Sequence, residues 1–457
     1  MSPLYREELL GKASKLVLEY TSSLSDDRAI ATEVIEAMIA HITHLRELNL
    51  IPVKDFETVL KELKKLKEDP SPLFSIDAED VHEALEIYLE GITGRSAFFI
   101  PLGRSRNDHV HTALLLKALR TLSSILSKII EVRSEVLGKA KELLKSPMPS
   151  FTHLQPAQVT TVAHYLVYVD EVLRTHYEFI KLVRGFALGM CPLGAGASSG
   201  TLVPLNRARL AELAGFRGFI ENSIYASGSR DVLSLCMHPV VNLLVALSRI
   251  AEDLIIFNTP SLSFVKVPSK HLATSSMMPH KRNPISLEVL RAWSAEVIGH
   301  EVAFLTIMKG VPSGYNLDLQ EGNRHVVAIL DKALKALTIF SDLVKGLQFD
   351  SSAIENFLKR YPTYAVDVAE YISLKTGAPF REVHGLVASA VREAGLVLSR
   401  FIEILEERTG VDRDSLMELS IPAKVIELRA TEGSPNPNKV AETIERRLKE
   451  VRSMETA

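Results

Sequence analysis

The sequence predicts an all-α protein with an elongated central bundle of long helices and smaller helical N- and C-terminal domains. Three observations predict this class. Apolar residues recur at three- and four-residue spacing over long stretches, Pro and Gly residues cluster between those stretches, and no block of the chain is rich in strand patterns. From these features we expect an N-terminal helical domain at 1–105, a central long-helix domain at 106–350 and a C-terminal helical domain at 351–457.

Five long helices form the expected bundle. The first carries apolar residues such as Leu115, Leu119 and Leu122 at helical spacing, and its length would be about 55 Å at the rise of an α-helix. Pro239 predicts a kink or break in the third helix. Because such helices are apolar over much of their circumference, we expect the chain to associate with itself. The five ranges are 108–145, 157–188, 231–257, 286–307 and 322–347. The tail from 379 to 451 predicts three or four short helices.

The composition is that of an ordinary globular protein. The chain has 457 residues, 46% of them apolar, and a formal net charge of −3, so nothing calls for nucleic acid or a membrane as partner. Cys191 and Cys236 lie far apart without a metal-ligand pattern, which predicts neither a disulfide nor a zinc site and favours the cytoplasm. The segment 1–20 is amphipathic and charged, unlike a signal peptide.

A polar segment precedes each expected long helix. Helix N-termini carry unpaired N–H groups and favour carboxylate ligands, although capping by residues such as Asp108, Asp231 or Ser286 is the plain alternative. All five segments are rich in Arg, Asn, His, Gln or Tyr, which favours a dicarboxylate site. They read GRSRND at 103–108, FTHLQPAQ at 151–158, ASGSRD at 226–231, SSMMPHKRNP at 275–284 and YNLDLQ at 315–320.

The segment SSMMPHKRNP has the composition of a loop that wraps a small anion. Lys281 supplies a positive charge, Asn283 supplies donors together with backbone N–H groups, and the hydroxyls of Ser275 and Ser276 supply a partner for proton transfer. The plain alternative is a cationic pair on a solvated loop. The two prolines at 279 and 284 favour a loop of defined shape.

This segment closely resembles the signature loop of the fumarase/aspartase superfamily, Gly-Ser-Ser-x-Met-Pro-x-Lys-x-Asn-Pro, with Thr274 in place of the leading glycine. GRSRND and YNLDLQE, together with THLQPAQ and the Arg230-Asp231 pair, are similar to the argininosuccinate lyase branch. The resemblance covers the chain from about 102 to 321. It implies an enzyme that releases fumarate from argininosuccinate in arginine biosynthesis without a cofactor or metal, and a homotetramer whose active sites are shared between subunits.

The resemblance also implies the catalytic roles. Ser275 is the general base, Lys281 and Asn283 hold the dianionic aci-carboxylate intermediate, and His153, supported by Glu288, acts on the leaving-group side. From the sequence alone, a serine such as Ser275 more often caps or bonds to backbone. A lone histidine is more often structural, but His153 lies in a polar segment before a helix.

Further residues are implied to contact the substrate. Arginine binds carboxylates bidentately, although each arginine of the GRSRND segment has a structural ion pair as its alternative. The implied substrate-binding set is Arg104, Ser105, Arg106, Asn107, Thr152, Gln155, Arg230, Ser276, Asn283, Tyr315 and Gln320.

Three departures from the argininosuccinate lyase pattern keep alternatives open. The loop reads PHKRNP, which is similar to the adenylosuccinate lyase branch, Met38 stands in place of a serine, and Asn323 stands in place of a lysine. Adenylosuccinate lyase is therefore the alternative enzyme, although no Gly-rich phosphate loop is present. A catalytically silent structural relative is the alternative outside enzymes, and a generic helical scaffold is the remaining one.

Overall fold

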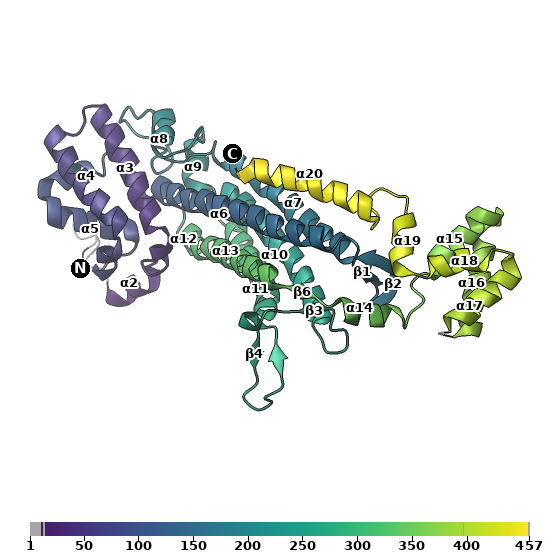
Figure 1. The fold of residues 1–457 in the computed structure, drawn as a ribbon. Helices are drawn as coiled ribbons and strands as arrows, with labels where there is room; N and C mark the ends of the chain where they lie inside the picture. Colours follow the sequence, from purple (N-terminus) through teal and green to yellow (C-terminus); the bar gives the residue numbers. More distant parts are fainter. Residues whose placement is uncertain (1–10, 12–13, 396, 456–457) are drawn as a thin grey trace. The chain divides into compact units, whose positions relative to one another are not determined.

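The computed structural model describes residue 11, residues 14–395 and residues 397–455. Helices dominate these residues (Figure 1), which confirms the predicted all-α class. No helix among them combines the length and apolar content needed to cross a bilayer. Most of the 1–20 segment lies outside the described residues, and its described part includes the start of α2 (Lys15–Thr21).

The five long helices are present close to their expected positions. For Pro239 we predicted a kink or a break; α10 continues through that residue, so a break is absent, and the kink stays a prediction. Four of the five helices begin and end within a few residues of their predicted bounds, whereas the predicted start of the second helix is wrong. These helices are α6 (Arg106–Glu142), α7 (Val162–Ala187), α10 (Asp231–Phe257), α11 (Ile285–Lys309) and α13 (Asn323–Gly346).

The start of the second helix was mispredicted because its first residues form a strand. β1 (Pro147–Thr152) pairs antiparallel with β2 (Gln155–Thr161), and α7 begins only at Val162. The β-branched run Val159-Thr160-Thr161 favours an extended chain over a helix. His153 and Leu154 form the two-residue turn with φ of 54° and 58°, as hairpins of this length require. The segment expected to lead directly into a helix is thus a hairpin tip.

Two further strand pairs are short. Both are antiparallel, and the second frames the SSMMPHKRNP segment, whose loop extends away from neighbouring elements (Figure 1). The pairs are β3 (Val265–Lys266) with β6 (Gln348–Phe349), and β4 (Ala273–Thr274) with β5 (Arg282–Asn283). A 3₁₀ turn, η4 (Ser269–His271), precedes β4.

Residue contacts divide the chain into two compact units. Unit 1 comprises Met1–Leu126, His176–Leu244 and Trp293–Lys335, and unit 2 comprises Ser127–Thr175, Val245–Ala292 and Ala336–Ala457. The boundaries between them fall inside the five long helices. The three domains predicted above are successive segments of the chain rather than contact units, and that division stays a prediction.

Unit 1 contains the N-terminal helices and several short connecting helices. Its N-terminal core forms where α3 buries Val34, Ile35 and Ile42 and packs on α4, which buries Leu63 and Leu66. The elements are η1 (Asp26–Ile30), α3 (Ala31–Glu47), α4 (Val53–Glu68), η2 (Ser71–Ser75), α5 (Val81–Thr93), η3 (Gly94–Phe99), α8 (Arg207–Leu213), α9 (Ser223–Gly228) and α12 (Asp318–Glu321).

Unit 2 contains the C-terminal helices. A buried carboxylate, Asp170 of α7, accepts hydrogen bonds of 2.8 Å from both Arg133 of α6 and Arg447 of α20, and so ties the last helix to the bundle. The tail, for which three or four short helices were predicted, contains five described helices, α16 to α20, and the last of them is longer than expected. The elements are α14 (Ser351–Leu358), α15 (Ala365–Thr376), α16 (Phe380–Ala394), α17 (Leu398–Thr409), α18 (Arg413–Leu419), α19 (Pro422–Leu428) and α20 (Pro437–Glu455).

Candidate active site

The GRSRND segment is held by the buried carboxylate of Asp108 in the first turn of α6. Its Oδ1 accepts from the backbone N–H of Ser105 at 3.3 Å, and its Oδ2 accepts from Gly194 and Gly196 at 2.9 and 3.1 Å. Burial raises the pKa of Asp108 to about 6. Asp108 therefore fixes the GRSRND segment against the loop that contains Gly194 and Gly196.

The two arginines of the segment have different environments. Arg104 is buried and forms an ion pair with Glu86 of α5, and its Nη1 also lies 3.9 Å from the sulfur of Met38. Arg106 is more exposed and contacts Asp80 at 3.0 Å and Glu79 at 3.4 Å. Both arginines thus form the structural ion pair that the sequence offered as their alternative role. Of the two, only Arg106 keeps its guanidinium partly exposed to a ligand.

The small polar residues of the segment lie beside a second loop. The Ser105 hydroxyl accepts from the Asn107 backbone N–H at 3.3 Å, which starts the helix. The Asn107 side chain donates to the Ala197 carbonyl at 3.4 Å. Both are half-buried, and the long bond to Ala197 leaves the amide of Asn107 available to a ligand.

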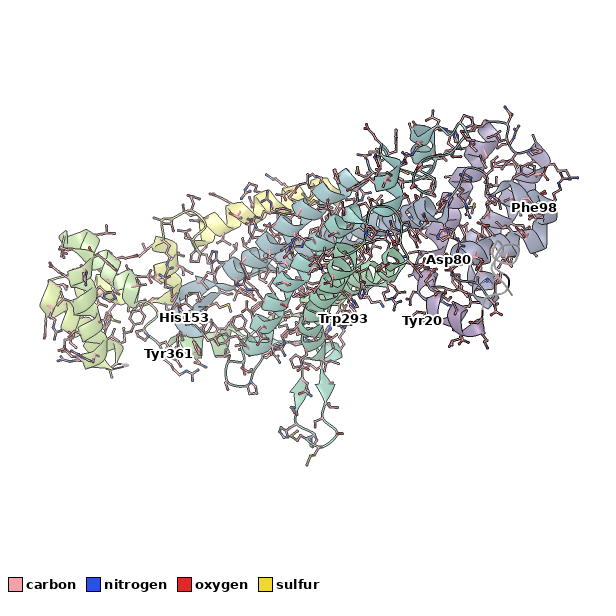
Figure 2. The ribbon with its side chains drawn as sticks, turned by 180° about the vertical axis from the view of Figure 1, so that it is seen from behind. Tyr20, Asp80, Phe98, His153, Trp293 and Tyr361 are labelled. Carbon is pink, nitrogen blue, oxygen red and sulfur yellow. The ribbon has the colours of Figure 1, made fainter. Side chains whose placement is uncertain are left out.

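A chain of hydrogen bonds joins the YNLDLQ segment to the N-terminal helices. The Tyr315 hydroxyl donates to Gln320 Oε1 at 2.9 Å, and Gln320 Nε2 donates to the hydroxyl of Ser23. Ser23 donates in turn to Asp27 Oδ2 at 2.9 Å, which also accepts from the Val81 N–H at 3.1 Å. Burial, with a smaller contribution from nearby Asp80, raises the pKa of Asp27 to about 7. Figure 2 labels Asp80 among these elements.

Arg230 is a buried cation without a carboxylate partner among the described residues. Only 1% of the residue is exposed, and Nη1 donates to the Ser229 carbonyl at 2.9 Å, while Nε and Nη2 have no described partner. Its guanidinium lies 6.0 Å from the ring centroid of Tyr315. Burial lowers its pKa to about 10, so it stays charged at neutral pH. A buried charge of this kind is expensive unless an anion compensates it.

The SSMMPHKRNP loop contains the predicted base and anion-binding residues. The Ser275 hydroxyl accepts from the backbone N–H groups of Met277 and Met278 at 3.3 and 3.0 Å, the local bonding that such serines usually make. Asn283 lies in β5, whereas Ser276 and Lys281 are exposed. The loop therefore presents Ser276 and Lys281 outward.

The described contacts of unit 2 do not bring the proposed acid/base partners together. His153 stands exposed in the turn of the β1–β2 hairpin, where Figure 2 labels it. Thr152 and Gln155 flank it and are also exposed. Glu288 is exposed in the first turn of α11. Among the described residues, neither His153 nor Glu288 forms a hydrogen bond or ion pair.

Two of the three departures from the family pattern, Met38 and Asn323, are buried. Met38 lies in α3 and is fully buried. Its sulfur contacts Arg104, and none of its side chain is exposed to solvent. Asn323 begins α13, and its buried amide nitrogen has no described partner. Neither residue replaces the hydroxyl or the cation that the pattern expects.

The sequence interpretation missed several polar residues of the Gln320 cluster, namely Ser23, Asp27 and Asp80. The signal available for them was weak, because serines and aspartates at helix starts are usually caps. Asp80 does cap α5, accepting from the Glu83 N–H at 2.8 Å. No group of three or more His, Cys, Asp or Glu side chains within the described part of the chain could hold a metal ion.

The fold and these motifs define a lyase. A family model described as Lyase matches residues 7–299, which is more than half of the chain. The chain therefore belongs to this lyase family, as the resemblance of its motifs predicted.

The similar proteins narrow the class. The chain is 43% identical to the argininosuccinate lyase of Pyrococcus furiosus over 98% of this chain and 95% of the relative. It is 34% identical to the argininosuccinate lyase of Sulfolobus acidocaldarius over 97% and 92%. Among solved structures, EDDS lyase in complex with formate matches with a TM-score of 0.85 at 24% identity, covering 96% and 89% of the two chains. A class II fumarase from Schistosoma mansoni matches with 0.72 at 18% identity, covering 88% and 90%. These two structures share the fold.

Proposed function

We propose that this chain splits argininosuccinate into arginine and fumarate, as a step of arginine biosynthesis in the cytoplasm. The observation that carries the proposal is the similarity to argininosuccinate lyases along nearly the whole chain. The polar cluster of unit 1 supports it. Arg230 has unpaired donors that suit a carboxylate, and Arg106 keeps its guanidinium partly open to a second one, while the succinyl group of argininosuccinate carries two carboxylates.

In the proposed reaction, Ser275 in its deprotonated form removes the Cβ proton of the succinyl group. The electron pair that remains forms the aci-carboxylate, which Lys281 and Asn283 stabilise by charge and hydrogen bonding. The pair then forms the C=C bond of fumarate as the C–N bond breaks. His153, oriented by Glu288, provides the proton that the departing guanidinium nitrogen needs. No cofactor or metal takes part.

The remaining predicted residues bind the substrate in this proposal. Arg104 acts indirectly in this proposal. Its buried ion pair with Glu86 suits it to positioning the GRSRND segment rather than contacting the substrate. The residues proposed to contact substrate directly are Ser105, Arg106, Asn107, Thr152, Gln155, Arg230, Ser276, Asn283, Tyr315 and Gln320. Closure of the SSMMPHKRNP loop over the substrate would exclude water from the site.

The proposed active form is a homotetramer in which different subunits complete each site. Two features support association. The catalytic residues His153 and Lys281 are exposed and lack described partners, and a row of apolar side chains on α11 is exposed as well. The row comprises Ile285, Val289, Ile298, Val302 and Leu305. The division into domains 1–105, 106–350 and 351–457 belongs to the same proposal.

The first test is fumarate release, followed by ultraviolet absorbance, with argininosuccinate and adenylosuccinate offered separately. Turnover of argininosuccinate alone is expected. Turnover of adenylosuccinate alone would instead mean that the PHKRNP sequence of the loop is the better guide to the substrate.

The second test replaces the proposed base. Ser275→Ala is expected to lose turnover by orders of magnitude while keeping the tetramer mass in solution, because only the proton acceptor is lost. Ser352→Ala, an exposed serine of α14, serves as the matched control and is expected to keep full activity. Full activity of Ser275→Ala would refute the role of the serine.

A further inference from the structure

Unit 2 contains a cavity of about 810 Å³ beneath the β1–β2 hairpin, called here the hairpin cavity. Its walls come from both strands of the hairpin, the first turns of α7, the last turns of α10, the end of α14 and the segment after α19. A volume of this size is typical of sites for small molecules.

The hairpin cavity does not contain the proposed catalytic histidine. Phe151, Leu154 and Gln155 line it, whereas their neighbours Thr152 and His153 do not. The consecutive residues from Met148 to Phe151 all line the cavity, so its contact with the hairpin is not confined to one face of β1. The Phe151 ring packs within 6.0 Å of the ring centroids of both Phe257 and Phe357. The lining therefore excludes His153 itself, although it includes Gln155, which is proposed above to contact the substrate.

Two opposite charges of α10 line the cavity one helical turn apart. Arg249 is exposed and forms no hydrogen bond or ion pair with any described residue. Asp253 is half-buried, and its Oδ2 accepts from the Tyr165 hydroxyl at 3.2 Å, which leaves its Oδ1 open. Side chains four residues apart on a helix lie about 6 Å apart at Cβ. Their head groups can therefore bind the two ends of one small zwitterion.

The other basic groups of the lining already have partners within the protein. Arg429 forms an ion pair of 2.9 Å with Asp367. His164 Nε2 lies 2.8 Å from the Gly433 carbonyl, which can only accept, so this nitrogen carries the proton. The other ring nitrogen, Nδ1, lies 2.8 Å from the Thr160 hydroxyl. Arg249 and Asp253 are therefore the two opposite charges of the lining that remain for a ligand, and this pair suits a ligand with one charge of each sign.

The apolar part of the lining is largely aromatic. The ring centroids of Tyr165 and Tyr168 of α7 lie 6.0 Å apart in a tilted arrangement, and Tyr165 packs edge-on to Phe257 at 5.6 Å. Tyr361 contributes from the end of α14, at 4.7 Å from Phe357. Figure 2 labels Tyr361 close to the hairpin that carries His153. Aromatic walls of this kind favour a ligand with a flat or bulky apolar side chain.

We propose that the hairpin cavity binds a zwitterionic α-amino acid with an aromatic or large apolar side chain, whose carboxylate contacts Arg249 and whose ammonium contacts Asp253. The lining contains none of the catalytic residues proposed above and shares only Gln155 with the proposed substrate-binding set, whereas Arg249 and Asp253 belong to neither set. The aromatic lining receives the side chain of the ligand.

The test is calorimetric binding to the full-length protein with three probes of similar shape. L-Phenylalanine carries both charges, 3-phenylpropionate carries only the carboxylate, and phenethylamine carries only the ammonium. L-Phenylalanine is expected to bind about tenfold more tightly than either analogue, since each analogue loses one ionic contact.

Two variants assign the charges to the two residues. Asp253→Asn keeps an oxygen for the Tyr165 hydroxyl and is expected to weaken L-phenylalanine and phenethylamine about tenfold while sparing 3-phenylpropionate. Arg249→Gln is expected to weaken L-phenylalanine and 3-phenylpropionate while sparing phenethylamine. Glu355→Gln and Arg381→Gln, which remove exposed charges of unit 2 outside the cavity, are the matched controls and leave all three affinities unchanged.

Three outcomes would overturn the proposal. The first is absence of L-phenylalanine binding to the wild-type protein, and the second is an equal effect of either variant on all three probes. The third is a change of molecular mass in solution for Arg249→Gln, which would place this residue in a contact between copies of the chain. If L-arginine binds with an affinity that neither variant changes, its binding is assigned to the proposed active site. The proposal for the hairpin cavity is then judged on L-phenylalanine binding alone.

Discussion

Asp27 offers a prediction in which the sign of a stability change depends on pH. The residue is 5% exposed, and one carboxylate oxygen accepts from both the Ser23 hydroxyl and the Val81 N–H. Asparagine has the same shape, and its oxygen can accept both bonds. Asp27→Asn therefore removes the titratable group while keeping its hydrogen bonds.

The magnitude follows from the pKa of Asp27, which burial raises from 3.8 to about 7. A raised pKa means that the folded state favours the protonated form. The stabilisation from that proton is complete below pH 3.8 and is lost as the pH rises through 7. Each tenfold difference in proton affinity corresponds to about 1.4 kcal/mol, so ionisation at pH 8 costs the folded state on the order of 4 kcal/mol.

Asp27→Asn is therefore expected to stabilise the protein at pH 8 by up to about 4 kcal/mol and by progressively less as the pH falls to 5. The assay is the urea midpoint of wild type and variant at pH 5, 6, 7 and 8, at one protein concentration. Asp77→Asn, at an exposed aspartate of the same unit, is the control and should shift no midpoint with pH. A variant that is less stable than wild type at pH 8, or whose difference is the same at every pH, would refute the reasoning.

Two other predictions concern buried charge. Asp170→Asn is expected to lower the free energy of unfolding by about 3 kcal/mol, because Arg133 and Arg447 lose their shared carboxylate, and the measurement is a urea titration at pH 7. An unchanged midpoint would mean that the network contributes nothing to stability. Burial lowers the pKa of His82 to about 4, so its contribution is complete above pH 6.5 and falls by about 2 kcal/mol between pH 7 and pH 5. His82→Leu is expected to shift acid unfolding to lower pH, and a midpoint shifted upward would contradict this sign.

Local periodicity was sufficient to predict most of the fold. The long apolar repeats of α6 and α13 predicted helices close to their observed ends, because an amphipathic helix needs only a stripe of apolar residues to define it. The pattern failed at the β1–β2 hairpin. There Val159, Thr160 and Thr161 satisfy their backbone groups in a partner strand, and the pairing is not visible in the local pattern.

The family and the chemistry of the motifs were also readable from the sequence. The order of residue types in SSMMPHKRNP and GRSRND is a local property, and it led to the lyase family that the comparisons identify. The roles of single residues could be predicted less well from the sequence. Ser23 and Asp27 were not singled out from the sequence, yet their hydrogen bonds connect them to Gln320.

The sequence by itself thus determined the helical class, the long helices and the lyase family, since each depends on residues close together in the chain. Only the tertiary structure decided which charges are compensated. Arg104 and Arg230 have the same side chain, but folding places Glu86 against Arg104 and leaves Arg230 without a described carboxylate. The physical reason is that burial and pairing depend on neighbours brought from distant segments, and these neighbours set the cost of each charge.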